Sequence, residues 1–203
     1  MTILEERPLE TAGTAAPENM ARRAMIDSQL RVSGVNDPAI LAAFAATARE
    51  DFVPAALRAN AYIDRALPLE DGHMLPAPLV HGRMLSEAAP VPGETVLVVS
   101  PSGCLAALVS ALGCDVTSTA PADASKKGAS ANLILIDGAI EELPAGLAAR
   151  LAENGRIVTG LVQRGVTRLA SGTKVGGEVS LLPLAEMGIP VLAEFAAPRR
   201  WSF

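Results

Sequence analysis

From Glu94 onward, the sequence alternates between short runs of β-branched or leucine residues and Ala/Leu-rich stretches of helical length. Such alternation is typical of βαβ units, in which each helix returns the chain so that the next strand lies parallel to the last. Four runs predict strands, near residues 95–100, 114–119, 132–137 and 155–161. Two later runs, near 166–171 and 178–184, are joined by Gly-rich KVGGE without a helix between them. They predict an antiparallel hairpin at the edge of a largely parallel sheet.

Two helices are predicted between these strands. The first covers residues 101–112, with Ser100 as its N-cap and Pro101 as its first helical residue. The second covers residues 139–153 and ends at Asn154-Gly155. In this interpretation Asp137-Gly138 closes a strand, and Asp137 is a polar turn residue that caps the second helix. The alternative is a ligand-binding position, because ligands of open α/β folds usually bind at this carboxyl edge of the sheet.

The N-terminal third is predicted to be helical. Residues 1–16 are polar and without periodicity, which predicts a flexible tail. A first helix, with Met25, Gln29 and Val32 on one side, ends near Gly34, and Asn36-Asp37-Pro38 begins a second. A third, short helix begins after Pro54. We therefore divide the chain into a tail at 1–16, a helical subdomain at 17–80 and an α/β domain at 81–203.

The charge balance bears on possible partners. A formal net charge of −5 and a pI near 5.1 predict no nucleic-acid partner, because phosphate recognition requires a clustered basic face. The sequence shows neither a signal peptide nor an apolar run of about 20 residues, so we expect a cytoplasmic protein without membrane association. Cys104 and Cys114 fit no metal or redox spacing and are expected to be buried thiols.

Several segments together resemble the protein-L-isoaspartate O-methyltransferase family. They are ARRAMIDSQLRVSGVNDPAILAAF, AREDFVP at 48–54, AYIDRALPLEDG at 61–72 and NLILIDGAIEELPAGLAARLAENGRIV at 132–158. The resemblance covers most of residues 20–160. It implies a Rossmann-like fold that uses S-adenosylmethionine to methylate isomerised aspartyl residues, with a helical N-terminal part and an antiparallel C-terminal edge.

The residues that should bind the substrate and the methyl donor depart from the family pattern. The substrate loop GHMLPAP at 72–78 has Met74, Pro76 and Ala77 where the family carries Thr, Ser and Gln. The cofactor loop is VLVVSPSGC at 96–104, one residue shorter than the family's glycine-rich loop. Only Ser100, Ser102 and Gly103 are candidate cofactor-binding residues there. In the alternative interpretation, Ser100 and Pro101 cap their helix without a ligand.

Two further departures concern the adenosine side of the expected pocket. The end of the second strand carries Thr117, Ser118 and Thr119 in place of the acidic residue that would bind ribose. Residues 120–131 are too few for a βαβ crossover, so the resemblance implies a sheet shortened by about one βα unit.

The two histidines are candidate metal ligands. His73 and His81 lie near Asp71, but their spacing matches no standard ligand pattern, and no metal site is predicted. His73 remains a candidate for binding a small anion in place of the first Gln of the family loop.

Three functions remain in competition. The favoured one is a catalytically degenerate relative without catalytic residues or a bound cofactor, which acts as a scaffold or interaction module for a protein partner or a second copy. An exposed apolar patch beside the cofactor loop and the deleted unit would distinguish it. The alternative is an active S-adenosylmethionine-dependent protein carboxyl methyltransferase that repairs isoaspartyl residues. A third possibility is another small ligand at the helix N-terminus of Ser100–Gly103.

Overall fold

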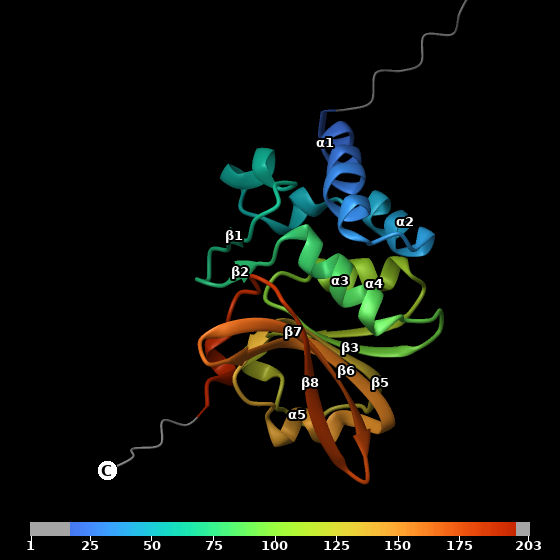
Figure 1. The fold of residues 1–203 in the computed structure, drawn as a ribbon, viewed down its shortest axis with the longest axis vertical. Coiled ribbons are helices and arrows are strands. Elements are labelled where there is room, and N and C mark those ends of the chain that lie inside the picture. Colours follow the sequence, from blue (N-terminus) through green and yellow to red (C-terminus); the bar gives the residue numbers. More distant parts are fainter. Residues whose placement is uncertain (1–16, 198–203) are drawn as a thin grey trace, which may run out of the picture.

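The computed structural model describes residues 17–197 and places a group of helices against a twisted sheet (Figure 1). Residues 1–16 and 198–203 lie outside the described part, and with them the predicted tail. No helix of the described part has the length and apolar character needed to cross a membrane.

The first helix changes its winding along its length. α1 (Pro17–Met25) continues as a π-helix over Ile26–Leu30 and a 3₁₀ turn over Arg31–Ser33, and Gly34 ends it with a φ of 87°. The predicted end is confirmed. The prediction that Val32 lies on the buried side is wrong, since Val32 is 74% exposed. The π turn adds a residue to the helix and the 3₁₀ turn tightens it, so a regular period of 3.6 no longer applies at Val32.

The next helical elements follow the predicted pattern. α2 (Pro38–Ala46) begins after Asp37, whose carboxylate accepts hydrogen bonds from Ala39 N at 2.8 Å and Ile40 N at 3.2 Å. Short 3₁₀ helices follow at Arg49–Phe52 and Ala55–Asn60. A two-stranded ribbon of β1 (Leu67–Pro68) and β2 (Met74–Leu75) then leads into α3 (Pro78–Ala88), which was not predicted. The proposed boundary between residues 80 and 81 falls within α3, and the division into domains stays a prediction.

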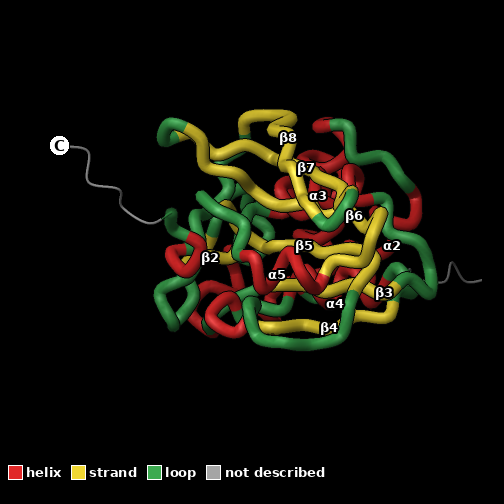
Figure 2. Tube along the Cα trace, turned by 90° about the horizontal axis from the view of Figure 1, so that it is seen from below, coloured by secondary structure: helices red, strands yellow, loops and turns green. Residues whose placement is uncertain are grey.

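The main sheet has six strands in the order β4-β3-β5-β6-β7-β8. They are β3 (Thr95–Val99), β4 (Asp115–Thr119), β5 (Ala131–Ile140), β6 (Leu151–Gln163), β7 (Val166–Val175) and β8 (Glu178–Glu186). The pairs among β4, β3, β5 and β6 are parallel, and β7 and β8 are antiparallel additions. Figure 2 shows β4 at one edge and β8 at the other.

The predicted hairpin is confirmed and has a simple cause. Gly176 and Gly177, both with positive φ, form the two-residue turn between β7 and β8. Positive φ at both positions is what a tight hairpin turn of this kind requires, and glycine adopts it without steric cost.

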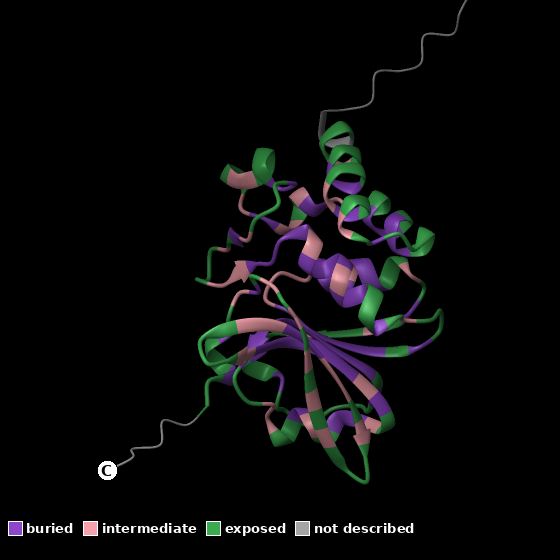
Figure 3. Ribbon diagram, in the orientation of Figure 1, coloured by how far each residue is buried: buried purple, intermediate pink, exposed green. Residues whose placement is uncertain are grey.

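Helices cover both faces of the central strands. α3 and α4 (Cys104–Ala111) lie on one face and α5 (Ala145–Arg150) on the other (Figure 1). Along β3, Val96 and Val98 pack in the cluster on the α3/α4 side, whereas Leu97 and Val99 pack in the cluster on the α5 side. Because both faces are buried, the central strands are almost continuously apolar (Figure 3).

The predicted helix over residues 139–153 is wrong. β5 continues to Ile140, α5 is only six residues long, and Asn154-Gly155 lies within β6. Ala139 explains the difference, because its N–H donates to Pro190 O at 2.7 Å and its carbonyl accepts from Leu192 N at 2.9 Å. This pairing with a distant segment keeps residues 139 and 140 extended.

The connection from β4 to β5 is short, as predicted. Between Thr119 and Ala131 the chain forms only a 3₁₀ turn at Pro121–Asp123. No strand lies in this connection, so β4 is left as an edge strand.

Candidate functional site

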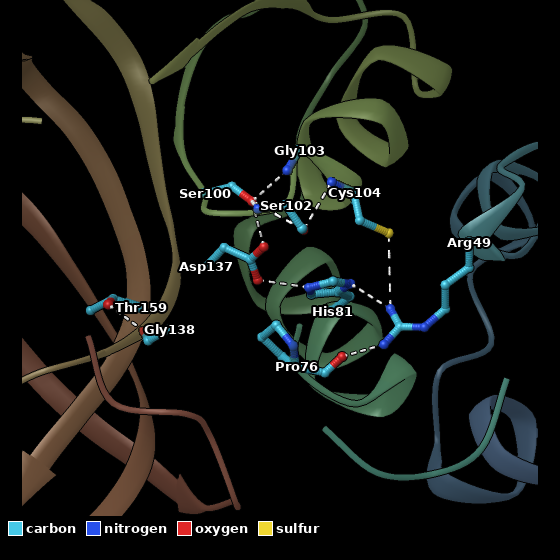
Figure 4. Close-up of polar contacts among 10 residues, drawn as sticks. All are labelled: Arg49, Pro76, His81, Ser100, Ser102, Gly103, Cys104, Asp137, Gly138 and Thr159. Atoms are coloured by element: carbon cyan, nitrogen blue, oxygen red, sulfur yellow. Dashed lines mark hydrogen bonds and ion pairs between the residues drawn. The ribbon is translucent and has the colours of Figure 1, made fainter. Parts of the chain in front are cut away.

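The loop after β3 satisfies its own backbone groups. The Ser100 hydroxyl, in a residue only 6% exposed, accepts hydrogen bonds from Ser102 N at 3.3 Å and Gly103 N at 3.0 Å (Figure 4). The Ser102 hydroxyl accepts from Cys104 N at 3.2 Å. Two serine hydroxyls therefore accept hydrogen bonds from three backbone N–H groups of this turn.

The helix that follows begins later than predicted. α4 starts at Cys104, after Gly103 with a φ of 77°, so the prediction that Pro101 is its first residue is wrong. Ser100 caps the turn rather than the helix itself. The left-handed conformation of Gly103 turns the chain between the loop and α4, which explains why a glycine remains here.

Asp137, on the neighbouring strand β5, is hydrogen-bonded to this loop. The Ser100 hydroxyl donates to Asp137 Oδ2 at 2.7 Å, and His81 Nε2 donates to Asp137 Oδ1 at 2.7 Å (Figure 4). Asp137 is fully buried within β5. The prediction that Asp137 caps a helix after the strand is therefore wrong, because the strand continues past it and its carboxylate points inward.

His81 contributes a buried imidazole from α3. Burial disfavours its charged form, but the Coulombic attraction of Asp137 and the hydrogen bond between them outweigh burial and raise the pKa of His81 to about 9. His81 is accordingly an imidazolium at neutral pH and forms a buried ion pair with Asp137.

Arg49 extends this network into the helical part. Its guanidinium donates to Ala61 O at 2.7 Å and to Pro76 O at 2.5 Å, while NH1 lies 3.5 Å from His81 Nδ1. NH1 also lies 3.9 Å from Cys104 Sγ. Arg49 is buried, and desolvation lowers the pKa of its guanidinium. We call Arg49, His81, Asp137 and Ser100 the buried polar chain.

No sequence pattern predicted the buried polar chain. One signal was present, since Asp137 is the only acidic residue in the apolar run NLILIDGAI and such a residue needs a partner when buried. The partner could not be found from spacing, because residues 49, 81, 100 and 137 meet only through the tertiary fold.

The second histidine lies at the protein surface. His73 Nδ1 forms an ion pair with Asp71 Oδ2 at 2.9 Å, and its Nε2 contacts Glu194 Oε1 at 2.8 Å. Although desolvation acts in the opposite direction, these carboxylates raise the pKa of His73. Asp71 and Glu194 contact both ring nitrogens, which disfavours the binding of a small anion by His73, and that hypothesis stays a prediction. No cluster suited to a metal ion occurs among residues 17–197.

A shallow hollow of about 440 Å³ lies beside the cofactor loop. Pro101 and Ser102 form one side, and three acidic residues, Asp51, Glu70 and Asp71, lie around it. A carboxylate substrate would meet negative charge here rather than a positive partner.

The residues of this region do not fit an S-adenosylmethionine molecule. The loop N–H groups are bonded internally, the strand that precedes them carries buried Val98, and β4 ends in Thr117, Ser118 and Thr119. No carboxylate is placed to bind ribose at that strand end. Ser100, Ser102 and Gly103 remain the candidate positions, and the contacts of both serines are made within the loop or with Asp137.

A largely parallel sheet covered by helices on both faces, with a polar loop at the carboxyl end of its first parallel strand, defines the Rossmann-like class of α/β folds (Figure 1). The sequence profile of the family described as Protein-L-isoaspartate(D-aspartate) O-methyltransferase (PCMT) matches residues 20–119. A protein-L-isoaspartate O-methyltransferase from Methylorubrum populi is 30% identical over 201 residues, which covers 81% of this chain and 94% of the relative. The chain belongs to the protein-L-isoaspartate O-methyltransferase family.

Further comparisons agree with this assignment. A protein-L-isoaspartate O-methyltransferase from Koribacter versatilis is 33% identical over 165 residues, covering 68% of this chain and 74% of the relative. The fold matches the crystal structure of a beta-aspartate methyltransferase (PCMT) from Plasmodium falciparum in complex with S-adenosyl-L-homocysteine. That match has a TM-score of 0.70 at 17% identity and covers 85% of this chain and 98% of the other. The predicted family and fold class are confirmed.

Proposed function

We propose that this chain is a non-catalytic member of its family that uses the methyltransferase fold as a scaffold or protein-interaction module. The observation that carries the proposal is the Ser100 hydroxyl, which accepts from the Ser102 and Gly103 N–H groups and donates to Asp137. The loop thereby fills its hydrogen-bonding capacity from within the chain. A methyl donor would have to break these bonds before it could use the same N–H groups.

The acceptor side supports the same proposal. A methyl acceptor of the kind named in the relatives is a carboxylate, and the hollow next to the loop is lined by Asp51, Glu70 and Asp71. Met74 and Pro76 in the adjoining segment offer no side-chain hydrogen-bond donor. Binding and orienting two reactants is the main requirement for methyl transfer, and the described residues offer little for either.

The first experiment is isothermal titration calorimetry of S-adenosylmethionine and S-adenosylhomocysteine into the full chain. The expected result is no saturable heat, with the Methylorubrum populi relative titrated in parallel as positive control. One-site binding tighter than about 100 μM, roughly −5.5 kcal/mol, would overturn the proposal. It would instead favour the alternative, an active protein carboxyl methyltransferase that repairs isoaspartyl residues.

The proposed partner is a protein or a second copy of the chain in the cytoplasm. The apolar patch expected beside the cofactor loop is absent from the described residues, since β4 presents Asp115, Thr117 and Ser118 to solvent. Exposed apolar side chains lie instead on the edge strand β8, where Leu182 is 64% and Leu184 is 43% exposed. Sedimentation equilibrium of the wild-type chain and of a Leu182→Ser, Leu184→Ser variant tests whether self-association involves this strand.

A further inference from the structure

A second hollow, of about 290 Å³, lies at the opposite end of the parallel strands from the cofactor loop. It is bordered by the amino ends of β3, β4 and β5, at Thr95, Asp115 and Ala131, whereas Ser100 lies beyond the carboxyl end of β3. Thr117, Ser130 and Arg150 complete its polar lining. The hollow is therefore separate from the candidate site and lies where the shortened β4–β5 connection leaves the sheet edge.

Arg150 is the unusual residue of this hollow. It is 9% exposed, yet it takes part in none of the ion pairs among residues 17–197. Only its Nε donates a hydrogen bond, to Ala129 O at 3.4 Å. Neither terminal nitrogen of the guanidinium has a hydrogen-bond partner among the described residues. A buried arginine generally has its fork of N–H donors filled by a carboxylate or phosphate.

The guanidinium packs against the backbone of a glycine. A Cβ on Gly128 would lie 2.7 Å from NH2 and 2.9 Å from Cζ of Arg150, so the backbone of Gly128 packs directly on the guanidinium. The Ser130 hydroxyl donates to Arg150 O at 3.2 Å and holds the same loop. The contact with Gly128 and the hydrogen bond from Nε to Ala129 O place the guanidinium at the edge of the hollow.

Hydroxyl donors accompany the guanidinium in the lining of this hollow. Arg150 is the one cation of the lining and Asp115 its one carboxylate, and no ion pair among residues 17–197 joins the two. The hydroxyls of Thr95 and Thr117 can donate to oxygen atoms beside the guanidinium, whereas the Ser130 hydroxyl already donates to Arg150 O.

From these observations we propose that the hollow is a binding site for a small oxoanion, a phosphate or carboxylate group whose oxygens take the terminal N–H groups of Arg150. A hollow of 290 Å³ has room for such a group and a few further atoms. The site concerns ligand binding only and does not depend on whether methyl transfer occurs.

The test is an NMR titration of the ¹⁵N-labelled full chain with inorganic phosphate and, separately, with succinate at low ionic strength. The expected result is saturable shifts at the amides of Thr117, Gly128 and Ser130 with at least one probe. Saturation by phosphate alone identifies a phosphate site, and saturation by succinate alone identifies a carboxylate site. Shifts that stay linear in concentration for both probes would overturn the proposal.

Variants separate ligand binding from a structural role of Arg150. Arg150→Gln should weaken binding about 10–100-fold, because a charge-assisted hydrogen bond is lost. Arg31→Gln is the charge-matched control, since Arg31 is exposed and lies outside the hollow, and it should bind like the wild type. Unchanged binding in Arg150→Gln would contradict the proposal.

A further variant covers the case in which Arg150→Gln does not fold. Thr117 is exposed on β4, so Thr117→Val leaves the core intact. It should weaken binding about 2–10-fold through the lost hydroxyl, with no change in the urea unfolding midpoint. Unweakened binding in this variant would count against the proposed lining.

Discussion

His81 Nε2 lies 2.7 Å from Asp137 Oδ1, and neither side chain has any exposed surface. The pair joins α3 to the central strand β5, directly behind the loop that carries Ser100. Burial of two charges is costly, and the hydrogen bond that the Ser100 hydroxyl donates to Asp137 offsets part of that cost. This ion pair therefore couples the stability of the core to the conformation of the cofactor loop.

Removal of Asp137 should destabilise the protein strongly. Asp137→Ala leaves the His81 imidazolium and the Arg49 guanidinium buried without a counter-charge, and breaking a buried pair in this way costs about 3–5 kcal/mol. Urea unfolding followed by circular dichroism measures the loss. Asp115→Asn is the control, because Asp115 is exposed and should change the free energy of unfolding by less than about 0.5 kcal/mol. Equal effects of both variants would show that the buried pair is not stabilising.

The His81–Asp137 pair also predicts a pH dependence. The pKa of His81 is about 9 in the folded protein and 6.5 in an unfolded chain, so the folded state binds more protons between these values. The stabilisation is complete below pH 6.5 and is lost as the pH rises through 9. By linkage the loss amounts to about 3 kcal/mol at most.

The measurement is the free energy of unfolding at intervals from pH 6 to pH 9.5. His81→Gln should remove most of the slope. His73→Gln is the matched control, since the pKa of His73 is raised too but its side chain is partly exposed, so that variant should keep most of the slope. A slope that survives in His81→Gln and disappears in His73→Gln would assign the effect to the surface histidine.

Local patterns predicted those elements whose cause is local. Asp37 and Pro38 were sufficient to predict the start of α2, and the two glycines at 176 and 177 were sufficient to predict the β7–β8 turn. The central strands were predicted because both of their faces are buried, which leaves an apolar run in the sequence.

The errors have nonlocal causes. Residues 139–144 have the composition of a helix start, but Ala139 pairs with Pro190 and Leu192, about 50 residues later in the chain. The buried polar chain gathers Arg49, His81 and Asp137 from separate elements, so only the folded structure brings them together. The resemblance to the family indicated where the site would lie. The serines that replace family residues in the cofactor loop explain why its N–H groups are hydrogen-bonded within the chain.

The loop itself is predicted to be stabilised by Ser100. Ser100→Ala removes one hydrogen bond to Asp137 and two from backbone N–H groups, and should lower the free energy of unfolding by about 2 kcal/mol. Ser102→Ala loses its hydrogen bond from Cys104 N and should cost about 1 kcal/mol. Hydrogen exchange of the Gly103 amide should accelerate in Ser100→Ala. An amide that stays equally protected would mean that the hydroxyl is not its acceptor.

The contact between β5 and the C-terminal segment predicts a strict size limit at Gly138. A Cβ there would lie 2.5 Å from Leu192 Cγ. The backbone is held on the spot, because Gly138 O accepts from the Thr159 hydroxyl and Ala139 is hydrogen-bonded to Pro190 and Leu192. Gly138→Ala should therefore destabilise the protein by about 1–3 kcal/mol through overpacking. Gly188→Ala is the control, because nothing lies within 4 Å of its Cβ position and its φ is not positive, and it should leave the unfolding midpoint nearly unchanged. A Gly138→Ala variant as stable as Gly188→Ala would show that Leu192 can move aside, and that the C-terminal segment does not hold the end of β5.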